Sequence, residues 1–157
     1  MRLLMLLLTL SLSLGVRAGE PRVAEWSIRA PLDKVYPVVY RHLEAHRLFV
    51  VFEPDIGGNL AQFAERWGKD YNRNGLEGIR AMVFCNAWYA NAVGNAEPRM
   101  LALCPMHLTL IHKAGVTRVL YVRPSQVAEG TAAEGVAREI ESEVRTAVRE
   151  AFAELEP

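Results

Sequence analysis

The sequence has few of the features that nucleic-acid binding or common catalytic chemistry requires. Only three residues are lysine, and the 18 basic side chains are matched by 18 acidic ones. Nucleic-acid binding needs clustered Lys and Arg side chains, and no such cluster occurs along the chain. A Ser-centred nucleophile elbow, a Gly-rich phosphate loop and a paired-carboxylate signature are also missing. We therefore expect no nucleic-acid partner, and the motifs indicate no particular enzyme class.

Cysteine is scarce as well. Cys85 and Cys104 are the only cysteines, and they do not form a C-x-x-C motif. This spacing excludes a thioredoxin-type pair and the covalent attachment of a c-type haem. No lipobox cysteine follows the N-terminal apolar segment, so the sequence does not predict a lipoprotein.

Long apolar runs are limited to the N-terminus. Arg2 precedes a nearly unbroken apolar run at residues 3–14, and Val-Arg-Ala at 16–18 gives a small-x-small cleavage site. This run is too short to cross a bilayer, which takes about 20 residues. The pattern predicts a secretory signal peptide at residues 1–18 and a periplasmic or secreted mature protein. No second run approaches spanning length, so we expect no membrane association after cleavage.

The rest of the chain, residues 19–157, reads as one α+β domain. Its patterns predict the order strand, helix, four strands, helix, with two short helices inserted between strands. We expect a mainly antiparallel sheet with helices packed on one face. The predicted elements are a strand at 25–29, a helix at 31–46, a strand at 48–53, a short helix at 59–67, a strand at 79–85, a short helix at 86–95, strands at 101–112 and 116–122, and a C-terminal helix.

The C-terminal helix has the clearest pattern. Thr131 and Glu134 match a capping box at its start. Apolar residues then recur every fourth position, which predicts one face packed against the sheet: Val136, Ile140, Val144, Val148 and Phe152. The other face carries charged residues that we expect in water: Arg138, Glu141, Arg145 and Arg149.

A second segment resembles half of a calcium loop. Asp70, Asn72, Asn74 and Gly75 match D-x-[DN]-x-[DN]-G, but the acid required at the twelfth position is Ala81. Short amides and glycine also favour turns, because they bond the backbone and tolerate left-handed geometry. The segment is therefore predicted to be a turn that leads into the strand at 79–85.

The two cysteines are predicted to meet. Cys85 closes the strand at 79–85, and Cys104 lies near the start of the strand at 101–112. If these strands are antiparallel neighbours, the two thiols lie together at one edge of the sheet. In an exported protein such a pair most simply forms a disulfide, which would stabilise the fold by about 3 kcal/mol in the chain-entropy model. The alternative is a functional, reduced thiol.

Residues around Cys104 allow a metal site as a second alternative. Cys104, Met106 and His107 supply a thiolate, a thioether and an imidazole, a set suited to copper or haem iron. Strand alternation places Cys104 and Met106 on one face with His112, while His107 points the other way. His42 and His46 lie four apart on a predicted helix, where we expect surface histidines near a helix C-terminus.

Residues after Cys85 form the other candidate site. Asn86, Trp88 and Tyr89 follow it directly, and with Met106 they could line a ligand-binding site, although the aromatics could equally belong to the core. Cys85 just before a helix N-terminus is the better placed of the two thiols to be a reactive thiolate.

Three short motifs give the sequence a family resemblance. They are Phe-Glu-x-Asp-Ile at 52–56, Phe-Cys-Asn at 84–86 and Leu-Cys-Pro at 103–105. Residues 30–152 resemble the exported branch of the domain of unknown function 302 family. The resemblance implies a fold similar to that of the TATA-binding protein and carries no established activity. Exported members resemble companions of periplasmic c-type cytochromes and of sulfur-oxidation proteins, which implies partners of those kinds.

Together these observations leave three functional hypotheses open. The first is a non-catalytic periplasmic binding or redox-accessory protein. The second is a thiol-based sulfur carrier or enzyme that forms a persulfide on Cys85 or Cys104. The third is a structural or interaction module in which a disulfide only stabilises the sheet. The sequence does not establish the cofactor or the oligomeric state.

Overall fold

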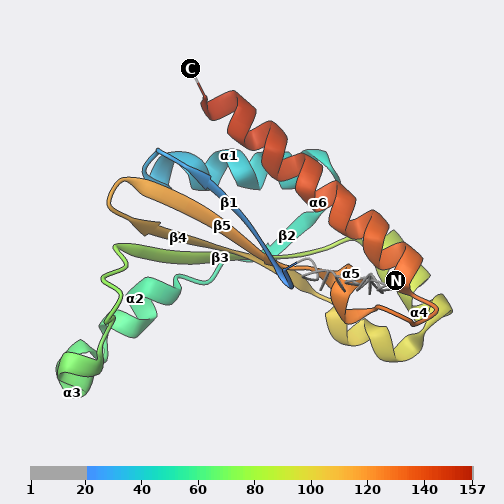
Figure 1. Cartoon of the computed structure of the whole chain (residues 1–157), viewed down its shortest axis with the longest axis horizontal. Helices are drawn as coiled ribbons and strands as arrows, with labels where there is room; N and C mark the ends of the chain where they lie inside the picture. Colours follow the sequence, from blue (N-terminus) through green and yellow to red (C-terminus); the bar gives the residue numbers. More distant parts are fainter. Residues whose placement is uncertain (1–20, 157) are drawn as a thin grey trace, which may run out of the picture.

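The computed structural model describes residues 21–156 and shows one antiparallel sheet with helices packed mainly on one face (Figure 1). The predicted signal peptide at residues 1–18 lies outside the described residues. The elements are β1 (Val23–Ile28), α1 (Leu32–Ala45), β2 (Phe49–Phe52), α2 (Ile56–Ala61), α3 (Ala64–Trp67), η1 (Gly68–Asp70), β3 (Gly78–Cys85), α4 (Ala87–Ala96), η2 (Pro98–Leu103), β4 (Met106–Lys113), β5 (Val116–Val122), α5 (Pro124–Val127) and α6 (Glu134–Leu155).

The five strands follow the order β1-β5-β4-β3-β2, and every neighbouring pair is antiparallel. The central strand β4 connects to β5 through a short turn in which Ala114 and Gly115 both have positive φ. The predicted α+β fold is confirmed. No helix within residues 21–156 is long and apolar enough to cross a membrane.

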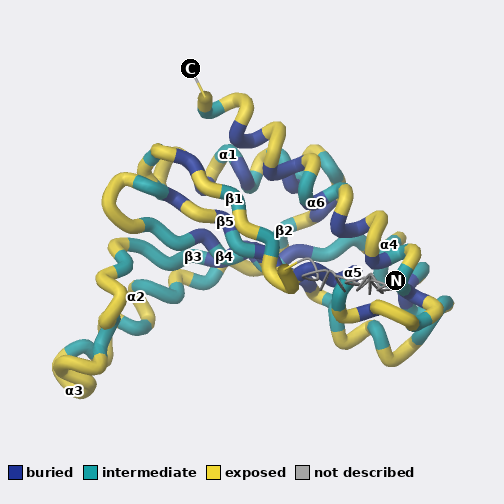
Figure 2. Tube along the Cα trace, in the orientation of Figure 1, coloured by how far each residue is buried: buried dark blue, intermediate teal, exposed yellow. Residues whose placement is uncertain are grey.

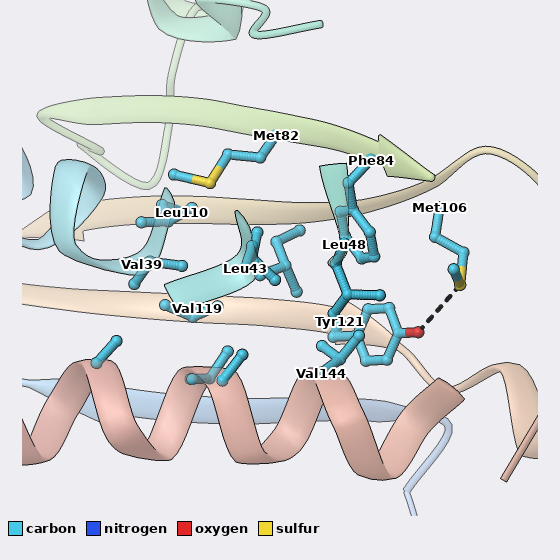
Figure 3. Close-up of a cluster of buried hydrophobic side chains, with 14 of the residues drawn as sticks. Val39, Leu43, Leu48, Met82, Phe84, Met106, Leu110, Val119, Tyr121 and Val144 are labelled. Atoms are coloured by element: carbon cyan, nitrogen blue, oxygen red, sulfur yellow. Dashed lines mark hydrogen bonds between the residues drawn. The ribbon is translucent and has the colours of Figure 1, made fainter. Parts of the chain in front are cut away.

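The core lies between the sheet and the two long helices α1 and α6, which cover the same face (Figures 1 and 3). Phe84, Leu110 and Tyr121 point from the strands into this layer and are almost fully buried. Leu43 of α1 and Val144 of α6 meet them from the helices. The apolar residues at every second strand position therefore face those at every fourth position of α6, as expected for a helix packed on a sheet.

The C-terminal helix follows its predicted apolar stripe but differs at two positions. Ile140, Val144, Val148 and Phe152 are all buried, as predicted. The helix begins at Glu134 after Ala133, so Thr131 is not its N-cap. The Glu134 carboxylate instead accepts the backbone N–H of Gly130, and this hydrogen bond ties the start of α6 to the preceding turn.

Glu141 was predicted on the exposed face of α6 and is in fact buried. Its carboxylate accepts hydrogen bonds from Arg123 Nε at 2.7 Å and from the Ser125 hydroxyl. Arg145 adds a third contact from the next turn of the helix. Burial alone would raise the pKa of Glu141, but the hydrogen bonds from Ser125 and Arg123 hold it below its usual value. The prediction was wrong because Arg123 and Ser125, which bury this carboxylate, come from the segment after β5 and not from the helix itself.

Two further boundaries differ from prediction. The helix expected at 59–67 is split into α2 and α3, with Asp55 accepting the Gly58 N–H at the start of α2. Residues 101–105 are not a strand: Pro98 opens the helical turn η2, and the ladder of β4 starts only at Met106. Pro105 has no N–H to donate to a ladder, which accounts for the late start of this strand.

The calcium-like segment is a turn, as predicted. Asn72 has positive φ, and its side chain exchanges hydrogen bonds with both backbone groups of Leu76. Gly75 also has positive φ. The amide oxygen of Asn72 is therefore occupied by the backbone of its own turn.

The second face of the sheet has little cover. The α2–α3 segment lies on this side at one end of the strands, whereas α4 packs beside α6 at the other end (Figure 1). Figure 2 shows exposed and half-buried positions along the strands between them. This face is called the open face below, and the face under α1 and α6 the covered face.

Candidate dithiol site

Cys85 is the last residue of β3 and lies on the open face. It pairs across the sheet with Phe49 of β2, while the preceding Phe84 points into the core with no exposed surface. Alternation along the strand thus turns Cys85 away from the helices. The thiol is half-buried.

Cys104 lies where the sequence predicted it relative to Cys85, although not within a strand. Phe84 pairs with Met106 in the antiparallel ladder of β3 and β4, so Cys104 comes just before the strand end that lies beside Cys85. Burial raises the pKa of the Cys104 thiol, and the nearby Cys85 raises it further. The fold therefore brings the two thiols close together. Both are free in this structure, so the disulfide stays a prediction.

Asn86 has a structural role beside the dithiol. Its side-chain oxygen accepts the N–H of Tyr89 and caps α4, and its amide donates to the carbonyl of Arg47 at 2.9 Å. Arg47 itself has a φ of 59°, in the turn between α1 and β2. Asn86 thus fixes the start of α4 against this turn and places Cys85 directly before the N-cap of the helix.

The aromatic residues of α4 line a hollow between the end of α1 and the start of α4. The hollow has a volume of about 350 Å³, and Asn86, Trp88 and Tyr89 contribute to its wall together with His46 and Glu143. Trp88 is 73% exposed, which rules out the alternative that it is a core residue. Tyr89 is half-buried, and burial together with the carboxylates of Glu143 and Glu139 raises its pKa. Three of the four predicted ligand-binding residues therefore surround one cavity.

Met106, the fourth, does not belong to this hollow. Its side chain is 6% exposed on the covered face, and its sulfur accepts the Tyr121 hydroxyl at 3.4 Å (Figure 3). Strand alternation gives a single residue to only one face of the sheet, so Met106 and Cys85 face opposite ways.

Of the four metal candidates, Cys104 precedes β4, and Met106, His107 and His112 are spread along that strand. His107 is exposed on the open face, whereas Met106 is in the core. His112 lies at the far end of the strand, where Nδ1 bonds the Thr117 hydroxyl at 2.9 Å and Nε2 lies 3.5 Å from Glu77. The structure does not bring these side chains together, and residues 21–156 contain no cluster of three His, Cys, Asp or Glu residues suited to a metal ion.

His42 and His46 are not the free surface histidines that the sequence predicts. Both are less than one-fifth exposed and contact glutamates of α6. His46 lies 3.0 Å from Glu143 and 2.8 Å from Glu150, while His42 lies 3.0 Å from Glu154. Hydrogen bonds to Glu150 and Glu143 raise the pKa of His46. The spacing of these glutamates, seven and four residues apart on one helix, is the signal that sequence reasoning missed.

Comparison with known proteins supports the fold and gives no function. The chain is similar over 83% of its length to the crystal structure of an uncharacterised conserved DUF302 protein from Bacillus stearothermophilus, with a TM-score of 0.69. The similarity covers 98% of that chain at 14% sequence identity, which establishes a shared fold. The comparison with curated proteins gave no match.

A family model agrees with the resemblance found in the sequence. The model for the domain of unknown function DUF302 matches residues 25–155, which include both cysteines and every strand from β2 to β5. The chain therefore belongs to the DUF302 family.

Proposed function

We propose that this protein is an exported redox-accessory protein whose working group is the Cys85–Cys104 pair. The observation that carries the proposal is the position of the two thiols at neighbouring ends of β3 and β4, close enough for Cys85 to raise the pKa of Cys104. Both thiols are half-buried, so they are accessible to a reaction partner, unlike thiols in a core.

The reaction is a reversible two-electron exchange. Cys85 attacks a disulfide of the partner as a thiolate, forms a mixed disulfide and releases one partner thiol. Cys104 then loses its proton, attacks the Cys85 sulfur and releases the second partner thiol. The protein becomes oxidised to an internal disulfide, and the partner gains two electrons and two protons. Burial raises the pKa of the Cys104 thiol, and Cys85 lies directly before the N-cap of α4, so we propose Cys85 as the attacking thiol and Cys104 as the second one.

The family resemblance suggests where such a pair acts. Exported relatives resemble companions of periplasmic c-type cytochromes and sulfur-oxidation proteins, and we propose partners of these kinds. The periplasm is an oxidising compartment in which an internal disulfide persists. The exposed indole of Trp88 and the hollow at the start of α4 supply a surface on which a partner can rest during exchange.

The test is a redox titration of the purified protein in glutathione buffers, read by intact mass after alkylation of free thiols. We expect a reversible loss of about 2 Da, the mass of two hydrogens, between reducing and oxidising buffers. Cys85→Ser and Cys104→Ser should each abolish this change and instead form a mixed disulfide with glutathione. Wild-type protein that keeps two alkylatable thiols in oxidised glutathione would contradict the proposal, and a disulfide that resists reduction throughout would favour a purely structural bond.

The free state of both thiols favours one second candidate, a sulfur carrier. Cys85 would take the terminal sulfur of a donor persulfide, and the donor would leave as a thiolate. Incubation with a persulfide donor should then add about 32 Da to the wild type and to Cys104→Ser, but not to Cys85→Ser. Absence of this adduct on the wild type would exclude the carrier function while leaving the dithiol exchange untouched.

A further inference from the structure

The open face of the sheet carries a continuous row of side chains across all five strands. Phe52 of β2 pairs with Val83 of β3, and Val83 pairs with His107 of β4. Leu108 pairs with Tyr121, so His107 stands beside Val122 of β5, which in turn pairs with Val23 of β1. We call this set of residues 52, 83, 107, 122 and 23 the transverse row. Four of its five members are apolar.

The transverse row is exposed to a degree that is unusual for such side chains. Phe52 is 63% exposed, Val122 is 47% and Val23 is 46%. Phe49, beside Cys85 on the same face, is 51% exposed. Together these side chains leave on the order of 400 Å² of apolar surface in water, taking about 200 Å² for a phenylalanine. Contiguous patches of this size mark interaction sites on soluble proteins.

The strand sequences indicate burial on both faces. An antiparallel sheet with one face in water shows alternating apolar and polar residues. Here β2 reads Phe-Val-Val-Phe, β3 contains Ala-Met-Val-Phe and β5 ends in Val-Leu-Tyr-Val. One residue in two of these runs packs under α1 and α6, and the alternate positions lie on the open face, where Phe49, Phe52 and Val122 are exposed.

The charges on the open face favour a neutral partner with the same surface. Arg118 of β5 and Glu25 of β1 form an ion pair with N and O atoms 3.6 Å apart, so they cancel each other. Within the transverse row His107 is the one titratable residue, and it lies at the centre of the row on β4. Lys113 lies farther along β4 on the same face, away from the transverse row, and its ammonium contacts the Asn74 carbonyl. The transverse row itself carries no fixed charge, so it does not repel an identical row or another apolar surface.

We propose that the open face binds the open face of a second copy of this chain. A two-fold axis in the interface along β4 sets each strand against its counterpart from the other edge of the sheet. Val83 of one copy then meets Val122 of the other. Phe52 meets Val23, so that a large ring packs against a smaller side chain. In a standard interface each copy buries about 800 Å² of its surface, of which about 450–520 Å² is apolar. The transverse row with its half-buried neighbours supplies an area of that size.

The central position of His107 gives this arrangement a specific consequence. The symmetry places the two His107 side chains against each other at the axis. His107→Leu should tighten the dimer because it removes two polar rings from an apolar interface, and His107→Arg should weaken it through the repulsion of two like charges. A gain of affinity in one variant and a loss in the other at the same position cannot result from misfolding.

The experiment measures the mass of the purified protein by sedimentation and by light scattering over about 1–200 µM, a range that covers micromolar dissociation constants. We expect twice the chain mass at the upper end. Phe52→Asp and Val122→Asp should raise the dissociation constant by at least about 100-fold, because each buries a charge in the interface. Both side chains are about half exposed in the single chain, so far-UV circular dichroism should show an unchanged fold.

Trp88→Asp is the matched control. Trp88 is more exposed than any member of the transverse row but lies on α4, outside the strands, and its loss should leave the dimer intact. A wild-type protein that remains a monomer at 200 µM (about twenty-fold above a 10 µM dissociation constant) would overturn the proposal and leave the face to a different partner. A dimer that survives both aspartate variants would also overturn it, because the copies would then associate elsewhere.

Discussion

The two faces of the sheet are built from alternate residues of the same strands, yet they differ in almost every physical respect. On the covered face, Phe84, Leu110 and Tyr121 are packed against α1 and α6 and lose nearly all contact with water. On the open face, Phe52 and Val122 remain about half exposed, and Cys85 is only half-buried. One face thus carries the stability of the chain, and the other carries the groups available for chemistry and association.

The comparison teaches that adjacent residues of one strand have separate roles. Phe84 and Cys85 follow each other in β3, and the pleat directs them to opposite sides. A substitution on the covered face should therefore change the free energy of unfolding, and one on the open face should change redox chemistry or association. Four predictions test this division.

The largest effect is expected for Phe84→Ala. This side chain is fully buried and stacks near the ring of Tyr121, with 6.4 Å between the ring centroids. Removal of a buried phenylalanine ring costs about 3–5 kcal/mol of stability through lost burial and the cavity that remains. Urea denaturation followed by circular dichroism measures the change. A loss below about 1 kcal/mol would mean that the core does not depend on this residue.

Glu141→Ala should have the next largest effect, about 3 kcal/mol, because it removes the buried carboxylate that pairs with the Arg123 guanidinium and accepts the Ser125 hydroxyl. The pKa of Glu141 lies below its usual value, so this contribution is present above about pH 4.5, the usual pKa of a glutamate, and is lost as the pH falls. The wild-type and variant stabilities should thus converge in acid. Glu139→Ala, an exposed position on the same helix, is the control and should change little.

His46→Gln should have a smaller, pH-dependent effect on the contact between α1 and α6. The pKa of His46 is raised in the folded state, so its contribution is complete below about pH 6.5, the usual pKa of a histidine, and is lost as the pH rises through the folded pKa. The pKa of Glu154 is lowered to about 2 by Arg41 and His42, so its contribution is lost only as the pH falls below about 4.5. This helix contact should therefore be strongest between about pH 4.5 and 6.5.

Thermal denaturation of the wild type and of His46→Gln at about pH 5.5 and 8.5 measures this effect, which should reach only a few degrees for a partly exposed pair. The melting temperatures should differ more at the lower pH. A difference that grows as the pH rises would contradict the assigned direction. Arg149→Gln, an exposed change on α6 without these contacts, should leave the pH dependence unaltered.

Phe52→Ser should have the smallest effect on the stability of the single chain, within about 0.5 kcal/mol, because the ring is already 63% exposed. The measurement requires a dilution series, since association adds stability that depends on protein concentration. We expect the concentration dependence of the wild-type melting temperature to disappear in the variant. A large loss of stability at low concentration would show that the open face contributes to the fold of the monomer.

Local patterns in the sequence predicted most of the fold. The strands at 79–85 and 116–122 were predicted with bounds close to those of β3 and β5, and the four-residue stripe of α6 correctly assigned Val144 to the core. These patterns succeed because the period of each element decides which side chains share a face. The antiparallel pairing of β3 with β4, on which the predicted meeting of Cys85 and Cys104 depends, is present in the structure.

Residues whose partners lie far away in the sequence were the ones that prediction misplaced. Glu141 is buried because Arg123 and Ser125 approach it from the segment after β5, and His46 is held because Glu143 and Glu150 lie opposite it on α6. Trp88 is exposed because α4 extends beyond the sheet rather than covering it (Figure 1). None of these contacts leaves a local signal, because each depends on how two elements dock.

The sequence by itself determined the elements, their apolar faces and the neighbouring positions of the two cysteines, because periodicity and antiparallel pairing are local or nearly local properties. Only the tertiary structure decided which face of the sheet the helices cover. That choice buried Met106 and left Phe52, Val122 and Cys85 in reach of a partner, since two long helices fill one face of a five-stranded sheet and leave the other uncovered.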